Sequence, residues 1–264
     1  MIELFSLRDR ASSAGNQMKF RSGNLWYKVD FLGYEGLSEY VISSLLSFSN
    51  LCHGEYVNYE LTEISREGES WNGCVSEDFT GGWQLITLDR LFQQMLGYGV
   101  NQMYLEEPDH RRRLQLVVES TVGLTGIRDF GAYMSRMLTI DALFLNEDRH
   151  AQNIALLMSP TGTFKPAPLF DHGAGLLSDT TLDYPMEGNI FDQIRCAKSR
   201  SFCQDFDEQV DLAEELYGQH LKFAFTRRDV EEILDRAVQY PESVRHRVLE
   251  IILQRRSKYR YLFP

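Results

Sequence analysis

The stretch LFLNEDRHAQNIALL, residues Leu143–Leu157, sets a polar cluster inside an apolar frame. Leu, Ile and Phe flank two acids, an arginine, a histidine and two asparagines. Ionised groups are costly to bury without partners, so such a cluster usually has a partner or a chemical role. Carboxylates and amides supply hard oxygen ligands, and a carboxylate or imidazole can move a proton. The segment is therefore a candidate catalytic loop.

Two acids and an amide in and after this segment are spaced as metal-assisted phosphoryl transfer requires. Asp148 and Asn153 lie five residues apart, and residues 154–158 then predict a short strand. A second short strand, APLF at 167–170, delivers Asp171 into the turn DHG. Asp148 can accept a hydroxyl proton, while oxygens of Asn153 and Asp171 suit Mg²⁺. The order Asp-x₄-Asn, strand, turn, strand, Asp-x-Gly is how protein kinases arrange these groups.

The loop departs from the usual kinase forms H-R-D and D-F-G. Asp148 precedes Arg149 and His150, and His172 stands where Phe is usual. His150 can hold the loop by hydrogen bonds or contact the metal-site aspartate, and a structural role is the simpler interpretation of a lone histidine.

The first eighty residues predict a small sheet and one helix. Their alternating β-formers and a Ser-Gly-Asn turn favour a hairpin, and an apolar face at helical spacing follows it. The paired glycines of FTGGW, residues 79–83, predict a loop. The expected elements are strands at 18–21 and 25–31 around a turn at 22–24, a helix within 35–49, and strands within 56–64 and 71–79.

Beyond that loop the chain is mainly helical. Helices are expected at 88–96, 111–122 and 126–145, and a helical tail fills the last third. Within the tail, Thr226 and Asp229 form a capping pattern. The sequence thus predicts an α+β fold of two lobes. The sheet-rich N-lobe would span 1–81 and the helical C-lobe 82–264.

A phosphate loop and a lysine precede the predicted helix. In SSAGNQMK, Ser12–Lys19, Gly15 lets backbone N–H groups approach phosphate oxygens. Lys28 lies on an alternating strand, and an inward lysine must have a partner. Glu35 and Glu39 compete for that role. We choose Glu39, because it lies within the apolar face, whereas an acid at the helix start is favoured by the dipole anyway.

Together these motifs resemble the HipA-like serine/threonine kinases over roughly residues 10–180. NEDRHAQN and APLFDHGAGL resemble the D-x-H-x-x-N loop and later metal site of that family, and SSAGNQMK resembles its S-x-A-G-x-Q-x-K phosphate loop. WYKVD and SEYVIS stand at the places of its nucleotide lysine and helix glutamate. HipA carries an extra N-terminal subdomain, whereas about ten residues precede the phosphate loop here, so the resemblance implies a short, minimal member.

The resemblance implies a bilobal kinase-like fold and transfer of the γ-phosphoryl group of Mg-ATP to a protein Ser or Thr hydroxyl. Lys28, oriented by Glu39, would hold the phosphates, and Asp148 would deprotonate the hydroxyl. The expected nucleotide-binding residues are Ser12, Ser13, Gly15, Asn16, Lys28, Glu39, Glu77 and Phe79. The expected catalytic residues are Asp148, His150, Asn153 and Asp171, of which Asn153 and Asp171 would bind Mg²⁺.

Regulation and partners are also implied by the resemblance. In that family a serine of the phosphate loop can be autophosphorylated, which ejects the loop. Ser12 or Ser13 is such a site by hypothesis, since a phosphate there repels those of ATP. Several HipA-like kinases are toxins of toxin–antitoxin modules that modify aminoacyl-tRNA synthetases. A protein substrate of that kind and a separate antitoxin protein are therefore the expected partners.

Composition narrows the remaining classes. The chain has 264 residues, 43% of them hydrophobic, and a formal net charge of -11, which disfavours direct nucleic-acid binding. It has no apolar run of about 18 residues and no signal-peptide pattern, so we expect a cytoplasmic protein without a membrane partner. The four cysteines form no C-x-x-C pair and are expected to be free thiols in the core. The most basic stretch, 244–263, predicts a helix with a solvated face.

Four alternatives remain open. A phosphatidylinositol-type lipid kinase shares the layout, although the acidic chain lacks an obvious basic membrane surface. A small-molecule kinase would use residues 180–264 to shape a pocket. A non-catalytic nucleotide-binding module would normally have lost one of the candidate Lys, Asp, Asn and Asp residues, and all of them are present here. A transition-metal site formed by His150, His172, Asp148 and Asp171 would leave the lysine, its glutamate and the phosphate loop without a role.

Overall fold

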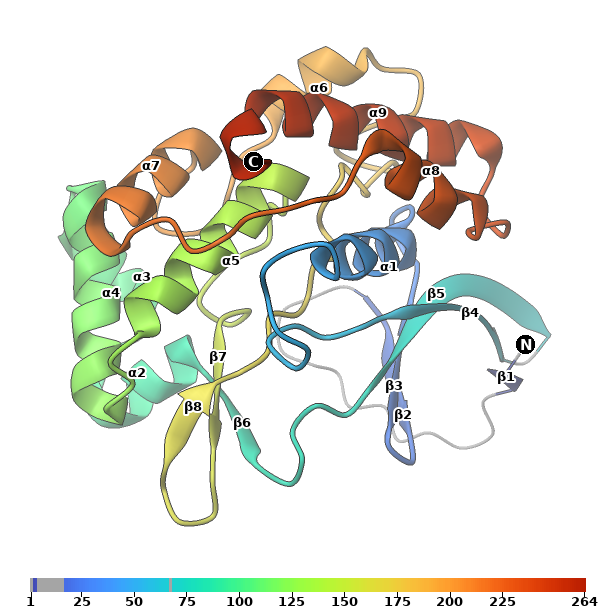
Figure 1. Cartoon of the computed structure of the whole chain (residues 1–264). Helices are drawn as coiled ribbons and strands as arrows, with labels where there is room; N and C mark the ends of the chain where they lie inside the picture. The colour runs from blue at the N-terminus through green and yellow to red at the C-terminus, as the bar shows by residue number, and fades with distance from the viewer. Residues whose placement is uncertain (1, 4–16, 67) are drawn as a thin grey trace.

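A five-stranded sheet and one helix form the N-terminal part of the protein (Figure 1). The computed structural model describes residues 2–3, 17–66 and 68–264. The sheet order is β1-β4-β5-β3-β2, and only the β1–β4 pair is parallel. The strands are β1 Ile2–Glu3, β2 Lys19–Ser22, β3 Leu25–Val29, β4 Glu60–Arg66 and β5 Glu69–Glu77.

The β2–β3 hairpin places two lysines on one face. Its turn contains Gly23 with φ +60°, a backbone conformation that glycine adopts without strain. Ser22 pairs with Leu25, and this register sets Lys19 directly opposite Lys28. Facing residues of an antiparallel pair share a face, and like charges there repel. The hairpin therefore requires an anion close to both ammonium groups.

Helix α1, Glu35–Leu46, packs against this sheet at a contact that only glycines allow (Figure 1). A Cβ atom on Gly73 of β5 would lie 2.2 Å from the Lys28 carbonyl oxygen. A Cβ atom on Gly36 of α1 would lie 2.7 Å from the backbone carbon of Gly73. The close approach brings Glu39, one turn further along α1, to the side chain of Lys28.

A second, antiparallel sheet has the order β6-β7-β8, and β7 begins just after the candidate catalytic loop. Its strands are β6 Gln84–Thr87, β7 Ala155–Met158 and β8 Phe164–Pro166. The sequence predicted β7 but not β6, and it placed the last strand at 167–170. That placement is wrong, because Pro168 has no N–H to donate to a ladder. Within 167–170, Leu169 makes an isolated bridge to Tyr56.

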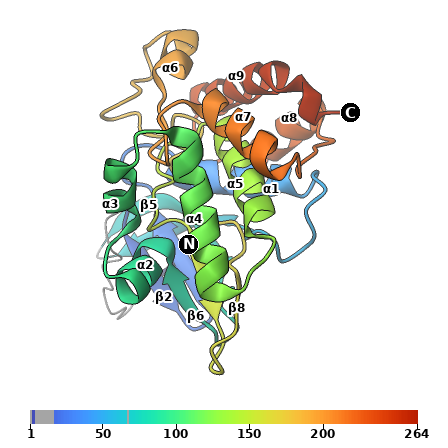
Figure 2. The ribbon, with the colours of Figure 1, turned by 90° about the vertical axis from the view of Figure 1, so that its left-hand side faces the viewer.

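The rest of the protein is helical, as predicted (Figure 2). The expected helix at 126–145 begins at Phe130, because Gly126, with φ +76°, ends the preceding helix. Thr226 and Asp229 form the predicted capping box. The short helix α3 was not predicted. The helices are α2 Leu88–Leu96, α3 Val100–Glu106, α4 His110–Thr125, α5 Phe130–Phe144, α6 Ile190–Cys196, α7 Phe206–Tyr217, α8 Arg227–Asp235 and α9 Glu242–Lys258, with a final 3₁₀ turn Arg260–Leu262.

Helix α5 forms the centre of the helical part and packs against α4, α7 and α9 (Figures 1 and 2). Two arginines of α9 are buried, so the expected solvated face holds only part of the basic charge of this helix. Arg255 donates to the Ala142 carbonyl of α5 at 2.7 and 3.2 Å. Arg247 donates to the Tyr184 carbonyl at 3.1 Å and to Gln193 at 2.7 Å. These two arginines thus form internal hydrogen bonds and do not contribute to the solvated face.

The α+β class agrees with the prediction, whereas the boundary between residues 81 and 82 stays a prediction. Among the described helices, none is both long and apolar enough to cross a bilayer. All four cysteines are free thiols. Cys74 and Cys203 are buried as expected, but Cys52 and Cys196 are exposed, so the core interpretation is wrong for those two.

Candidate active site

The candidate catalytic loop connects α5 to β7 and is closed by its own amide. Asn153 Nδ2 donates to the Asp148 carbonyl oxygen at 2.8 Å and reaches Asp148 Oδ2 at 3.3 Å. The five-residue spacing thus closes a tight loop. Because the amide nitrogen is engaged, Oδ1 of Asn153 is the atom available to a cation.

Arg149 forms the buried support of this loop. Its side chain is 1% exposed, and it pairs in bidentate fashion with Asp141 of α5 at 2.9 and 3.0 Å. It also donates to the carbonyls of Asn153 and Phe170, each at 2.9 Å. Burial raises the pKa of Asp141, and the adjacent guanidinium opposes that shift. Arg149 therefore joins α5, the loop and the residue before Asp171.

Lys28, Glu39 and Asp171 form a charge cluster beside the loop. Lys28 Nζ donates to Glu39 Oε1 and, at 2.5 Å, to Asp171 Oδ1. Lys19, opposite Lys28 in the hairpin, lies 3.4 Å from Asp171 Oδ2. Asp171 is thus the anion that the two facing lysines require, although it lies more than 140 residues away in sequence.

The charges in this cluster fix one another's protonation. Burial alone would lower the pKa of Lys28, but the carboxylates of Asp171 and Glu39 raise it well above its usual value. Burial alone would raise the pKa of Asp171, but Lys28 and Lys19 hold it well below its usual range. At neutral pH Lys28 is therefore a cation and Asp171 a carboxylate.

The turn that carries Asp171 is held in a left-handed conformation. Asp171 has φ +62°, which aspartate tolerates better than most residues. The His172 N–H donates to Glu39 Oε2 at 2.8 Å, and Ser38 Oγ donates to the His172 carbonyl at 2.8 Å. Asn146 Nδ2 reaches the Asp171 carbonyl at 3.3 Å. Helix α1 and the loop together fix the direction of the Asp171 carboxylate.

Among the described residues, His172 is not grouped with other metal-ligating side chains. Its side chain is fully buried, and Nδ1 faces the Arg149 guanidinium at 3.3 Å. Burial lowers the pKa of His172, and the charges of Arg149 and Lys28 lower it further, so the imidazole is neutral. A guanidinium in that position opposes a bound cation. In the described part of the chain, the two histidines and two aspartates of the transition-metal alternative do not gather at ligand distance.

One cavity of about 460 Å³ brings the four expected catalytic residues together. Asp148, His150, Asn153 and Asp171 all line it, and so do Lys19 and Gln17. Lys28 and Glu39 lie behind Asp171 and are not part of the lining. Within the cavity, Asp148 Oδ1 is 3.6 Å from His150 Nε2 and 3.4 Å from Arg200.

Solved structures with this fold include two bacterial proteins. The Helicobacter pylori proinflammatory kinase CtkA aligns with a TM-score of 0.63 over 97% of this chain and 94% of its own, at 17% identity. HipA of Shewanella oneidensis MR-1, solved with HipB and operator DNA, aligns with a TM-score of 0.52 over 96% of this chain and 66% of its own, at 14% identity. This chain has the fold of the HipA-like kinases. The sequence itself matches no family model and no curated protein.

Within this HipA-like fold, the remaining predicted residues divide into three groups. Glu39 pairs with Lys28, whereas Glu35 accepts the N–H groups of residues 31–33 at the start of α1. Glu77 ends β5, and the Phe79 ring lies tilted against Phe170 with the ring centroids 5.3 Å apart. Neither residue lines the cavity. Their place beside an adenine ring stays a prediction. Ser12, Ser13, Gly15 and Asn16 lie outside the described residues.

Three further residues at the candidate site were not among the predicted ones. Lys19 and Gln17 line the cavity, and both belong to the quoted phosphate-loop motif, which was the signal available. Gln17 Nε2 is buried and has no hydrogen-bond partner within the described ranges. Arg200 reaches Asp148 from a loop 52 residues further along the chain, and no local pattern marks it.

Proposed function

We propose that this protein is an ATP-dependent serine/threonine protein kinase of the HipA-like type. The observation that carries the proposal is the convergence on one cavity of Asp148, Asn153 and Asp171, with Lys28 and Glu39 directly behind Asp171. These are the parts that phosphoryl transfer needs, namely a cation, its orienting acid, oxygen ligands and a base. The fold shared with two kinase-related structures supports the same assignment.

The residues present fit Mg-ATP. A volume of about 460 Å³ falls within the usual size of ligand pockets, roughly 300–1,000 Å³. Asp171 and the free amide oxygen of Asn153 are hard ligands of the kind that Mg²⁺ prefers. The amide nitrogen of Gln17, which has no partner among the described residues, is a buried donor suited to a phosphate oxygen. When bound, Mg-ATP would supply the transferable phosphoryl group and neutralise its charge.

Each protein group would then have one task. Glu39 keeps the Lys28 ammonium charged and directed at the cavity wall, so that it can meet phosphate oxygens. Asp148 would orient the substrate hydroxyl and accept its proton, and Asn153 and Arg200 restrain its carboxylate. The remaining part of the phosphate site would come from Ser12, Ser13, Gly15 and Asn16. The adenine would contact the backbone of residues 77–79.

We also propose a protein substrate and a separate antitoxin partner. HipA of Shewanella oneidensis is described as part of a toxin–antitoxin system with HipB. By resemblance, the substrate would be a protein such as an aminoacyl-tRNA synthetase, and the chain would act in the cytoplasm. Because the net charge is -11, contact with DNA is assigned to the partner. Autophosphorylation at Ser12 or Ser13 would place a charge of about -2 against the ATP phosphates and silence the enzyme.

Intact-mass measurement of the purified protein with Mg-ATP, beside Asp148→Ala, tests the proposed kinase. We expect the wild type to gain phosphate and the variant to do so at least about 100-fold more slowly, since general-base catalysis contributes about 10²–10⁴-fold. ATP binding by calorimetry should survive in Asp148→Ala. Fragment spectra should locate the phosphate on Ser12 or Ser13. Absence of ATP binding to the wild type would contradict the proposal.

A further inference from the structure

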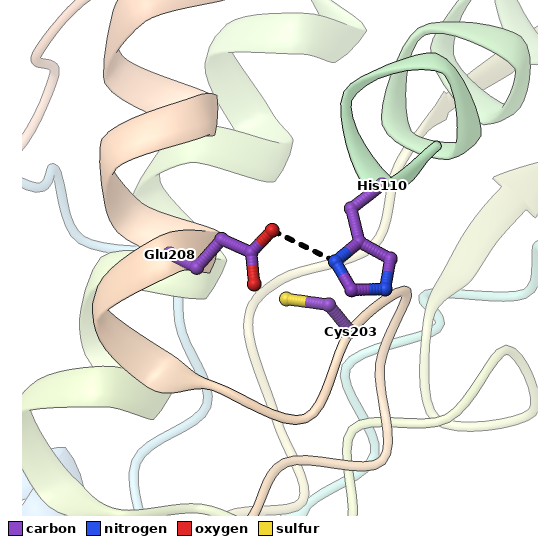
Figure 3. A group of neighbouring side chains, drawn as sticks. All are labelled: His110, Cys203 and Glu208. Carbon is purple, nitrogen blue, oxygen red and sulfur yellow. Dashed lines mark hydrogen bonds and ion pairs between the residues drawn. The ribbon is translucent and has the colours of Figure 1, made fainter. Parts of the chain in front are cut away.

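Three metal-ligating side chains meet away from the candidate active site, between the first turns of α4 and α7 (Figure 3). His110 is the first residue of α4, Cys203 lies in the preceding loop of α7, and Glu208 lies in the first turn of α7. One ligand atom from each lies within 4.8 Å of the other two. His110 Nδ1 is 2.7 Å from Glu208 Oε1, and the Cys203 sulfur points toward the Glu208 carboxylate beside this pair (Figure 3).

The α7 side of this cluster is held in place by hydrogen bonds. Asp205 caps α7, and its Oδ1 accepts the Glu208 N–H at 3.0 Å. Gln209 Nε2 donates to the Cys203 carbonyl at 2.5 Å. Cys203 itself is buried, and its thiol reaches the Asp205 carbonyl at 3.4 Å. The Cys-x₄-Glu pair is therefore presented by a fixed loop and helix start.

The α4 side is fixed as well. Asp109 caps α4 by accepting the Arg112 N–H at 2.7 Å, which sets the position of His110. Arg113, one turn further on, donates to the Phe202 carbonyl at 3.1 Å. This bond ties α4 to the residue before Cys203. Backbone hydrogen bonds on both sides thus hold the three residues close, in addition to the contacts that their own ligand atoms make.

We propose that His110, Cys203 and Glu208 bind one Zn²⁺ ion that joins α4 to α7. Thiolate, imidazole and carboxylate are the donors that Zn²⁺ takes, at about 2.0–2.3 Å. The side chains of His110 and Glu208 are 36% and 44% exposed, which leaves the outer side open for a water as fourth ligand. Tetrahedral coordination at these bond lengths separates ligand atoms by roughly 3.3–3.7 Å. His110 and Glu208 reach that spacing by small side-chain rotations.

Zn²⁺ binding at this site can be written with charges and protons accounted for. The Cys203 thiol releases its proton to solvent, and the thiolate and the Glu208 carboxylate together neutralise the two positive charges of Zn²⁺. The imidazole that binds the ion through Nδ1 carries its single proton on Nε2. None of the three residues lines the 460 Å³ cavity, so the site is independent of the proposed kinase function.

Co²⁺ titration of the reduced full-length protein is the decisive experiment, because a thiolate–Co²⁺ bond gives a charge-transfer band that oxygen ligands cannot produce. We expect one Co²⁺ per chain with this band, and its loss on adding Zn²⁺. Cys203→Ser should abolish the band, and His110→Ala should weaken Co²⁺ binding at least about tenfold. The Mg²⁺ site proposed above contains no sulfur, so it cannot imitate the signal.

Cys196→Ser is the matched control, since Cys196 is an exposed thiol outside the cluster. It should keep the band and the rise in melting temperature that Zn²⁺ causes in the wild type, whereas Cys203→Ser should lose both. His110 is partly exposed, so His110→Ala tests the site even if substitution of the buried cysteine impairs folding. A wild type without the band, or a band that persists in folded Cys203→Ser, overturns the proposal.

Discussion

The Asp171 carboxylate neutralises positive charge at the candidate site. Two lysines face each other across a hairpin, and the carboxylate that neutralises them arrives from a distant turn. The lysine–glutamate pair could be predicted, because Glu39 lies on the inward face of the helix after the strand. The second lysine could not be assigned from its sequence position alone. Its partner depends on how the DHG turn packs against the hairpin.

Arg149 is the residue whose loss should cost most stability. We expect Arg149→Met to lower the free energy of unfolding by about 3–5 kcal/mol, because Asp141 would remain buried without its partner. Urea unfolding followed by circular dichroism measures this change. The double variant Arg149→Met, Asp141→Leu should recover a large part of the loss. A single variant within about 0.5 kcal/mol of wild type would show that the pair does not support the loop.

Asp30, just after β3, should make stability depend on pH. Burial raises its pKa to about 7, against hydrogen bonds from Tyr240 and the Gly36 N–H. Between the unfolded pKa of about 3.9 and the folded value, the folded state holds more protons than the unfolded state. Stability therefore falls as pH rises from about 4 to 7 and is level above that. Asp30→Asn should remove this component in urea titrations, and an unchanged profile would refute it.

At the scale of elements, the sequence predicted those helices and turns whose signals lie within the element itself. The hairpin, α2 and the capping box of α8 follow from turn residues, periodicity and caps that lie within a few positions. The short elements α3 and β6 have no such signal, and they form because neighbouring elements cover them. The displaced strand shows that Pro168 outweighs a short apolar run, since β8 ends at Pro166.

The glycine contact between α1 and β5 gives a prediction at this scale. Gly73→Ala should destabilise the protein by about 1–3 kcal/mol, since the new methyl would overlap the Lys28 carbonyl. It should also weaken ATP binding, because Lys28 and Glu39 would be displaced. Thermal unfolding and calorimetry measure the two effects. Gly123→Ala is the control, because its methyl meets open space on α4 and should stabilise by up to about 1 kcal/mol.

For the whole molecule, the order of motifs predicted the fold class, but long-range packing could not be predicted. Arg247 and Arg255 belong to the most basic stretch, yet both point inward to carbonyl groups of distant segments. A sequence pattern shows that a helix is amphipathic. It does not show which cationic side chains find internal acceptors, since these depend on tertiary neighbours. The contact of the exposed Arg200 with Asp148 likewise depends on tertiary packing.

Arg247 gives the prediction for the whole molecule. It joins α9 to the segment after the DHG turn through Tyr184 and Gln193, and it also donates to the Tyr34 hydroxyl at 3.2 Å. We expect Arg247→Met to increase hydrogen exchange throughout 184–196, because these acceptors lose their donor. Exchange in α4, which Arg247 does not contact, provides the internal reference. Equal protection of 184–196 in both proteins would show that other contacts order this segment.

Helix α1 is fastened on two sides. Gly36 packs closely against the sheet, while Glu39 accepts the His172 N–H and Ser38 donates to the His172 carbonyl in the DHG turn. A rotation of α1 relative to the sheet would have to break these hydrogen bonds and the close glycine contact together. Opening or closing the cavity by rotating this helix would therefore have a high free-energy cost. A conformational switch would need less free energy in a segment that makes fewer tertiary contacts.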